Sequence, residues 1–199
     1  MANKLILIRH GETVWNYKKR YCGHNDIGLS KKGMAQAKKL RNRIKEEIIH
    51  KVYTSDRRRA IQTAKIIFNG SKQLKQIPDL AEINFGCFEG LTHRQILKKY
   101  PEIYKKWLKD PYNNHVPEGE KLTDFKKRII SSIKKIVCGN PSETVAVVCH
   151  GGAISAFITH ILRKRDFWKH IPHSASLTII EYERNKPKIK LLNDTAHLA

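Results

Sequence analysis

The fold is decided by Leu5-Ile6-Leu7-Ile8-Arg9-His10-Gly11-Glu12-Thr13, a stretch near the N-terminus. It starts with an unbroken apolar run, which is typical of a strand buried on both faces of a parallel sheet. The run ends at Arg9-His10, so a permanent cation and an imidazole stand where the strand gives way to a loop. Ligands of open parallel sheets bind beyond that end of the strands. This stretch therefore predicts both a central strand and a binding site.

A second stretch repeats the arrangement far along the chain. The run Thr144-Val145-Ala146-Val147-Val148-Cys149 is again apolar and leads directly into His150-Gly151-Gly152. In an open parallel sheet, the loops after several strands gather at one edge. Two buried strands that each deliver a histidine followed by glycine therefore predict one pocket built from both.

Size and composition place the chain among globular proteins. Its 199 residues suit one domain, residues 1–199, and a hydrophobic content of 40% argues against disorder. No apolar run approaches membrane-spanning length, and Arg9 comes too early for a secretory signal peptide. The cysteines form no Cys-x-x-Cys pair, and no cysteine or histidine cluster has the spacing of zinc ligands. We expect a reduced, cytoplasmic protein with no metal site and no membrane partner.

The net charge of +21 has two interpretations. A basic face could bind nucleic acid without sequence preference, because it attracts phosphates. Alternatively, lysines are spread over the surface and attract anionic metabolites. The lysines lie scattered along the chain, with no interleaved aromatic platform and no nucleic-acid motif. We therefore favour the second interpretation and expect no specific nucleic-acid partner.

Short extended segments alternate with helical ones along the chain. Helices are expected at about 57–68, 92–110 with a break at Pro101, 125–136 and 153–162, and extended segments at about 50–54, 77–83, 177–182 and 189–192. A further helix should begin after the N-cap Ser30, with apolar positions at Met34, Ala37, Leu40, Ile44 and Ile48. This alternation predicts a layered α/β domain with a mainly parallel sheet.

Four landmarks, in order, resemble the histidine phosphatase superfamily, the phosphoglycerate-mutase-like proteins. They are Arg9-His10-Gly11-Glu12-Thr13 with Trp15-Asn16, Ser55 through Arg59-Ala60, Glu82 before Phe85-Gly86 and Glu89-Gly90, and Val148-Cys149-His150-Gly151. The resemblance covers nearly the whole chain. It implies a three-layer α/β/α sandwich with a mainly parallel central sheet and a helical insertion beside the active site. We interpret residues 92–120 as that insertion and as a lid.

His10 is the expected nucleophile. A neutral imidazole keeps a nitrogen lone pair available near neutral pH, and phosphorus is a suitable target for it. A strand-end histidine taken alone is more often bonded to backbone, but Arg9 beside it and His150 in the matching position favour catalysis. The resemblance implies that His150 is the second active-site histidine, which donates to the transferring phosphoryl group.

The phosphate clamp calls for arginine, because guanidinium offers paired donors and stays charged. Arg9 is one candidate, and the other lies among Arg57, Arg58 and Arg59, between which composition does not choose. The resemblance selects Arg59 and leaves its two neighbours as surface charges. Gly151 can bring a backbone N–H close to the ligand. Asn16 could add a further donor, although capping or a turn would also explain it.

Glu82 is the expected general acid. Hydrolysis of a phosphomonoester needs a proton for the departing alkoxide, and a carboxyl can supply it. Burial would raise the pKa of Glu82 and nearby arginines would lower it, so the sequence leaves the direction open. Asp79, Glu89 and Glu12 are competitors. The resemblance selects Glu82, while Glu89 fits a role in shaping the loop from Gly86 to Gly90.

These residues predict a metal-independent, cofactor-free histidine acid-type phosphatase that hydrolyses a small phosphorylated metabolite through a phosphohistidine. One alternative is a cofactor-dependent phosphoglycerate mutase, although such proteins carry additional segments that shield the phosphoenzyme from water. The other alternative is a catalytically inactive or nucleic-acid-binding member. Substrate choice is expected to lie in the lid, whose sequence does not name the substrate. The oligomeric state is open, with a homodimer as one option, and the tail residue His197 is not assigned to the site.

Overall fold

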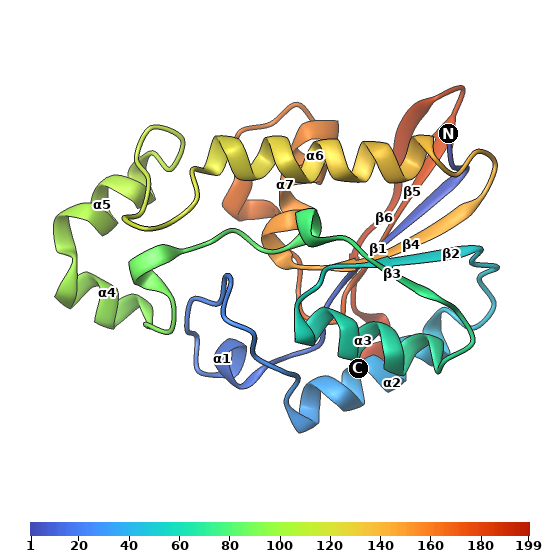
Figure 1. Ribbon diagram of the computed structural model, residues 1–199, viewed down its shortest axis with the longest axis horizontal. Helices are drawn as coiled ribbons and strands as arrows, with labels where there is room; N and C mark the ends of the chain where they lie inside the picture. Colours follow the sequence, from blue (N-terminus) through green and yellow to red (C-terminus); the bar gives the residue numbers. More distant parts are fainter.

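The computed structural model describes residues 1–199, and its centre is one six-stranded sheet in the order β3-β2-β4-β1-β5-β6 (Figure 1). β1, β2, β3 and β4 are mutually parallel, whereas β5 runs antiparallel to β1 and β6 antiparallel to β5. The mainly parallel sheet is thus confirmed, with an antiparallel hairpin at one edge. The strands are β1 Lys4–Arg9, β2 Lys51–Thr54, β3 Leu74–Gln76, β4 Thr144–Cys149, β5 Leu177–Glu183 and β6 Lys186–Asp194.

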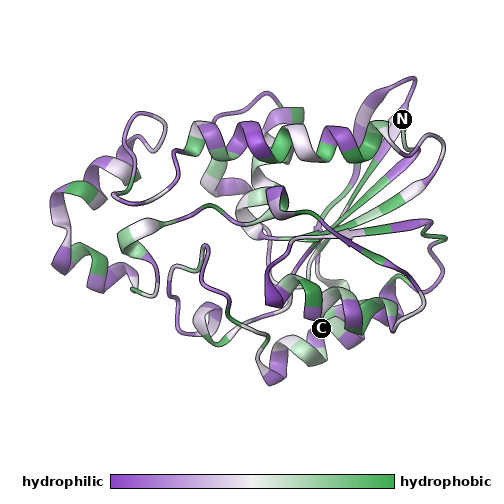
Figure 2. Ribbon diagram, in the orientation of Figure 1, coloured by the Kyte–Doolittle hydropathy of each residue, from purple (hydrophilic) through white to green (hydrophobic).

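Helices cover both faces of the sheet and complete the three layers. α2 (Lys31–Arg43) and α3 (Arg58–Phe68) pack on one face, and α6 (Leu122–Cys138) and α7 (Gly151–Ile161) on the other (Figure 1). α6 shows alternating hydrophobic and hydrophilic bands along its length (Figure 2), as expected of a helix with one buried face. No helix combines the length and apolar character that crossing a membrane requires.

The register of the central strands places the two histidines together. Arg9 at the end of β1 lies opposite Cys149 at the end of β4. The next residue of each strand is a histidine, and the N–H of His10 donates to the carbonyl oxygen of Cys149 at 3.0 Å. The expected juxtaposition of the two histidines therefore follows from strand pairing.

Two expectations about local structure were wrong. The helix after Ser30 ends at Arg43 with Ile44 as its C-cap, and Ile48 beyond it is 78% exposed. The segment expected to be extended at 77–83 contains a short 3₁₀ helix, Pro78–Leu80. Pro78 opens this turn because proline suits the first helical position. The extended segment is instead the strand β3, which lies just before this turn. Its sequence, Leu74-Lys75-Gln76, does not reveal it because a strand at the edge of a sheet needs no apolar run.

Residues 92–120 form a helical insertion. α4 (His93–Lys99) and α5 (Pro101–Lys109) are separated at Tyr100, so the predicted break at the proline is confirmed. The insertion stands off from the sheet on the side toward which β1 and β4 run (Figure 1). A separate small core fills this part of the protein: Phe88, Ile96, Tyr104, Trp107 and Val116. Phe85 and Trp168 pack against both this core and the main core, and so connect the two. The remaining short elements are the helix α1 (Val14–Tyr17) and the 3₁₀ turns Gly86–Phe88, Phe167–His170 and Ala196–Leu198.

Candidate active site

His10 and His150 face each other at the ends of β1 and β4. Their ring centroids are 5.2 Å apart with an angle of 63° between the planes. His10 is 3% exposed and His150 is fully buried. The two imidazoles thus lie side by side in the protein interior, and the sequence predicts that they come together.

The tautomer of His10 follows from its single hydrogen bond. Nδ1 lies 2.7 Å from the carbonyl oxygen of Gly11, which can only accept, so Nδ1 carries the proton. In the neutral ring, Nε2 then keeps its lone pair. Burial, Arg59 and Arg9 lower the pKa of His10 well below its usual 6.5, and the bond to Gly11 opposes them only partly. His10 is therefore neutral, with a basic nitrogen available.

The tautomer of His150 is the opposite one. The Nε–H of Arg59 donates to Nδ1 of His150 at 3.2 Å, and because arginine only donates, Nδ1 must accept. The proton then resides on Nε2, which lies 2.9 Å from the hydroxyl oxygen of Ser55. Burial and the charge of Arg59 lower the pKa of His150 well below 6.5, so it is also neutral. His150 therefore presents a donor beside the lone pair of His10.

Arg9 is held by backbone and keeps an unused donor. Its Nη1 donates to the carbonyl oxygen of Pro172, while its buried Nε–H has no partner in the protein. A Cβ at Gly151 would lie only 3.2 Å from Arg9 Nε, so glycine is what allows this close approach. An unpartnered buried donor is costly unless a ligand satisfies it. An anion at this point would meet Arg9 and the backbone N–H of Gly151, the first residue of α7, together.

Arg59 is the arginine that reaches the histidines, as the resemblance implies. It is fully buried, and its Nη1 and Nη2 donate to the carbonyl oxygens of Asn25 and Gly23 at 2.9 and 2.8 Å. Three of its five N–H donors are thus used within the protein, which leaves two for a ligand.

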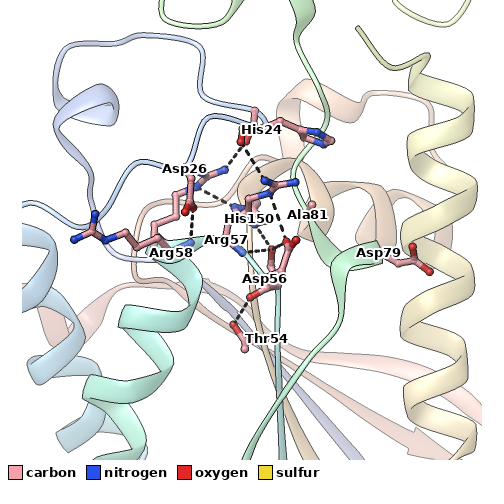
Figure 3. Close-up of polar contacts among 12 residues, drawn as sticks. His24, Asp26, Thr54, Asp56, Arg57, Arg58, Asp79, Ala81 and His150 are labelled. Atoms are coloured by element: carbon pink, nitrogen blue, oxygen red, sulfur yellow. Dashed lines mark hydrogen bonds and ion pairs between the residues drawn. The ribbon is translucent and has the colours of Figure 1, made fainter.

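The neighbouring arginines lie differently. Arg58 is exposed, as expected of a surface charge. Arg57 is only 25% exposed, and its guanidinium lies between the carbonyl oxygen of His24 and the carboxylate of Asp56 (Figure 3). The expectation of a solvated charge at Arg57 is therefore wrong, because its side chain bridges two loops.

Glu82 lies against the N-terminus of α7. It is 8% exposed, and its two oxygens accept from the backbone N–H groups of Gly152 and Ile83 at 2.8 and 3.0 Å. Burial raises the pKa of Glu82, and this outweighs the lowering by those two hydrogen bonds and by Arg59 and Arg9. The sequence leaves open whether the pKa of Glu82 is raised or lowered; in the structure it is raised, which favours the protonated carboxyl that a general acid needs.

The competing acids lie elsewhere. Glu12 forms an ion pair with Lys32 at 3.2 Å. Asp79 points away from His150 toward α6 (Figure 3). Glu89 accepts from the backbone N–H groups of His24, Asn25 and Phe85 at 2.7 to 3.2 Å, so it braces loops, as expected.

Asn16 makes the capping contacts that compete with a ligand role. Its Oδ1 accepts from the N–H and the hydroxyl of Thr13 at 3.0 and 2.9 Å, forming a capping box at the start of α1. Its backbone N–H donates to the hydroxyl of Thr13 at 3.1 Å, whereas its side-chain Nδ2 makes no hydrogen bond within the protein. A phosphate contact from Asn16 stays a prediction.

The structure adds supporting groups that sequence reasoning missed. Ser55, directly after β2, orients His150. In the sequence it belongs to one of the four landmarks without a role of its own, although its place at the same sheet edge as both histidines is a signal for one. The backbone of Ala175 donates to the carbonyl oxygen of His10 at 3.0 Å, and His197 lies 3.0 Å from the carbonyl oxygen of Ala175. The Ala175 contact is to backbone, so residue types cannot reveal it. No group of three or more His, Cys, Asp or Glu side chains could hold a metal ion.

Comparisons with known proteins agree with this arrangement. A family model described as the histidine phosphatase superfamily (branch 1) matches residues 5–195. Phosphoserine phosphatase 1 of Hydrogenobacter thermophilus is 32% identical over 199 residues, which cover 98% of this chain and 94% of that protein. Among solved structures, YhfR from Bacillus stearothermophilus matches this chain with a TM-score of 0.93 and 29% identity. A phosphoserine phosphatase from Entamoeba histolytica, in complex with 3-phosphoglyceric acid, matches it with a TM-score of 0.89 and 30% identity. Both structures and this chain are covered to 100%.

Proposed function

Since this chain belongs to the histidine phosphatase superfamily (branch 1), we propose that it hydrolyses phosphomonoesters of a small metabolite through a phosphohistidine on His10. The observation that carries this is the hydrogen bond from the Nδ1–H of His10 to the carbonyl oxygen of Gly11, which leaves the lone pair of Nε2 free. Burial and two arginines lower the pKa of the ring and so keep it neutral. A nucleophile must be unprotonated to attack, and this site keeps it so.

The first step forms a bond from His10 Nε2 to phosphorus and breaks the bond from phosphorus to the leaving oxygen. Glu82 gives its proton to that oxygen, so an alcohol departs rather than an alkoxide. In the second step a water attacks phosphorus, the bond to His10 breaks, and the Glu82 carboxylate takes a proton from the water. Inorganic phosphate leaves, and both residues return to their starting states.

The charge of the phosphoryl group is met by donors that are already in place. Arg9 contributes its unpartnered Nε–H, Arg59 its two unused donors, and Gly151 a backbone N–H at the start of α7. His150 carries a proton on Nε2 and lies beside the reacting nitrogen. Preorganised positive charge of this kind stabilises a phosphoryl transition state, the task that Mg²⁺ performs in other phosphoryl-transfer enzymes. We therefore propose catalysis without a metal.

The test is phosphate release from phosphoserine, phosphorylated sugars, nucleotides and α-ribazole phosphate, with and without EDTA. Turnover should survive EDTA, and turnover that EDTA abolishes and Mg²⁺ restores would contradict the metal-free proposal. A parallel assay with 3-phosphoglycerate and catalytic 2,3-bisphosphoglycerate tests the mutase alternative. Efficient phosphoryl exchange without phosphate release there would replace hydrolysis as the function.

The covalent step is tested separately by quenching turnover of a labelled substrate. Label should survive an alkaline quench and be lost in acid, because phosphoramidates are acid-labile. His10→Ala should abolish labelling, whereas His50→Ala, at the opposite end of the sheet, should label like the wild type. Near wild-type turnover by His10→Ala would show that another residue is the nucleophile.

A further inference from the structure

A cationic groove lies away from the phosphate pocket, between α6, the C-terminal end of α7 and the β5–β6 hairpin. Its volume is about 870 Å³, within the range of roughly 300–1,000 Å³ that is usual for small-molecule sites. α7 begins beside His150 and ends in this groove, so the two sites stand at opposite ends of one helix. The groove therefore does not belong to the site described above.

The polar lining of the groove carries one sign of charge. Five cationic side chains and His160 line it, and no carboxylate does: Lys126, Lys134, Arg163, Lys164 and Arg165. None of the five takes part in any ion pair of the protein. Burial first, and then the charges of Lys134 and Lys126, lower the pKa of His160, so both cations act on the same lining residue. A concave surface of a single sign concentrates ions of the opposite sign.

Two of these cations are held in place by an aromatic ring. Lys126 Nζ lies 3.1 Å from the hydroxyl oxygen of Tyr112, and Arg165 Cζ lies 4.9 Å from the centroid of the same ring. An aromatic partner orients a cation and leaves its charge unneutralised. Tyr112 thus positions two positive charges of the groove, and neither of them is in an ion pair.

The rest of the lining is apolar. Ile130, Ile161 and Tyr182 are partly exposed in it and lie over the buried side chains of Val137 and Phe157. A ligand with only a charge would leave this surface uncovered, and one with only apolar groups would leave the cations unpaired. A stable protein partner would need about 800 Å² of each surface, more than a single groove of this size offers.

We propose that this groove is a second ligand site, which takes a small organic anion with an apolar body. Its phosphate, sulfonate or carboxylate would lie among Lys126, Lys134 and Arg163, and its hydrocarbon or aromatic part over Ile130, Ile161 and Tyr182.

The probe is 8-anilinonaphthalene-1-sulfonate, which combines a sulfonate with aromatic rings and fluoresces when it leaves water. It should bind at a single saturable site in the presence of saturating orthovanadate, which occupies the phosphate pocket. N-phenyl-1-naphthylamine, which lacks the sulfonate, should bind at least about tenfold more weakly. Displacement of the probe by orthovanadate, or equal binding of the uncharged compound, would overturn the proposal.

The matched variants locate the site. Lys134→Glu with Arg163→Glu should raise the dissociation constant of the probe at least about tenfold, because both charges are reversed. Lys45→Glu with Lys72→Glu makes the same charge change beside another hollow and should leave binding unchanged. If the first pair loses its fold, the neutral pair Lys134→Gln with Arg163→Gln carries the same expectation. Unchanged binding by the folded groove variant, or binding of an acidic peptide but not of the probe, would overturn the proposal.

Discussion

Arg59 donates its Nε–H to Nδ1 of His150 across 3.2 Å, deep inside the protein. This one contact fixes which nitrogen of His150 carries the proton, and it places a permanent positive charge beside both histidines. Arg59 also ties the loop at Gly23 and Asn25 to the same point. The residue therefore links loop position, tautomer and charge, and lysine cannot reproduce this because it lacks the planar fork.

Arg59→Lys should lower kcat/KM by at least about 10²-fold, the usual effect of removing one preorganised donor from a transition state. Steady-state kinetics on one phosphomonoester measures it. Arg58→Lys changes the exposed neighbouring residue in the same way and should retain wild-type kinetics. Equal kinetics for wild type and Arg59→Lys would mean that the charge alone is needed and the fork is not.

Neutral buried histidines should make the protein sensitive to acid. The folded pKa values of His10 and His150 lie below 6.5, so the unfolded chain takes up protons first as the pH falls through 6.5. As the pH decreases below 6.5, the free energy of unfolding should then decrease by up to about 1.4 kcal/mol per pH unit for each histidine. Glu82, with its raised pKa, acts in the opposite sense, because above pH 4.5 the unfolded chain loses that proton first.

The difference between variants isolates the histidine effect. Urea unfolding of wild type and His10→Gln between about pH 7 and pH 5 should give a shallower fall for the variant. His115→Gln, at an exposed histidine with no side-chain hydrogen bond, serves as the control and should follow the wild type. A variant curve parallel to the wild type would show that His10 is as easily protonated in the folded protein as in the unfolded chain.

Much of the candidate site was predictable because it depends on strand ends. The apolar runs before His10 and His150 identify two buried strands, and pairing of β1 with β4 brings both histidines together. The helices of the layers were predictable for the same reason, since burial of one face imposes a period on the sequence. Ile48 shows the limit: it continues the apolar period but follows the end of α2 and is 78% exposed.

What the sequence could not supply depends on backbone groups and on balances of opposing effects. The bonds from Ala175 to His10 and from Arg9 to Pro172 involve carbonyl oxygens that every residue has. The pKa of Glu82 depends on burial against two hydrogen bonds and two arginines, and only coordinates show that burial prevails. β3 was missed because a short edge strand has few apolar residues to mark it.

The net charge of +21 should increase the rate of encounter with anionic substrates. Raising the salt concentration should lower kcat/KM for multiply charged phosphates, because exposed charges are screened over about 8–10 Å near physiological ionic strength. A singly charged aryl phosphodiester inhibitor should show a smaller salt effect on its inhibition constant. Salt-independent kcat/KM, together with tight and salt-resistant binding to one DNA or RNA sequence, would favour a nucleic-acid role.

Gly152 offers a way to displace Glu82 without removing it. A Cβ at this position would lie 2.3 Å from Glu82 Oε1, the far end of a flexible side chain, so the carboxyl can move aside. Gly152→Ala should therefore fold with a Tm close to that of the wild type and lose activity on alkyl phosphates. Gly139→Ala, beyond the end of α6, should keep its activity. Full activity in a folded Gly152→Ala protein would indicate that Glu82 need not stay on the Gly152 N–H.

Glu82→Gln tests proton transfer itself. Glutamine keeps the shape and its one carbonyl oxygen can still accept from Gly152 or Ile83, but it has no acidic proton to give. Alkyl phosphates have poor leaving groups, so their kcat/KM should fall by about 10²–10⁴-fold. p-Nitrophenyl phosphate needs little protonation and should lose much less in the same step.

The comparison must isolate phosphorylation of the enzyme, because in the proposed mechanism Glu82 is also the base when the phosphohistidine breaks down. Both kcat/KM and single-turnover rates report on the first step. The raised pKa of Glu82 adds a second signature. For alkyl phosphates, kcat/KM should fall as pH rises through that pKa, because the acid must be protonated, and the Glu82→Gln profile should lack this fall. Equal losses for both substrates would make Glu82 structural and return Glu12 and Glu89 to consideration.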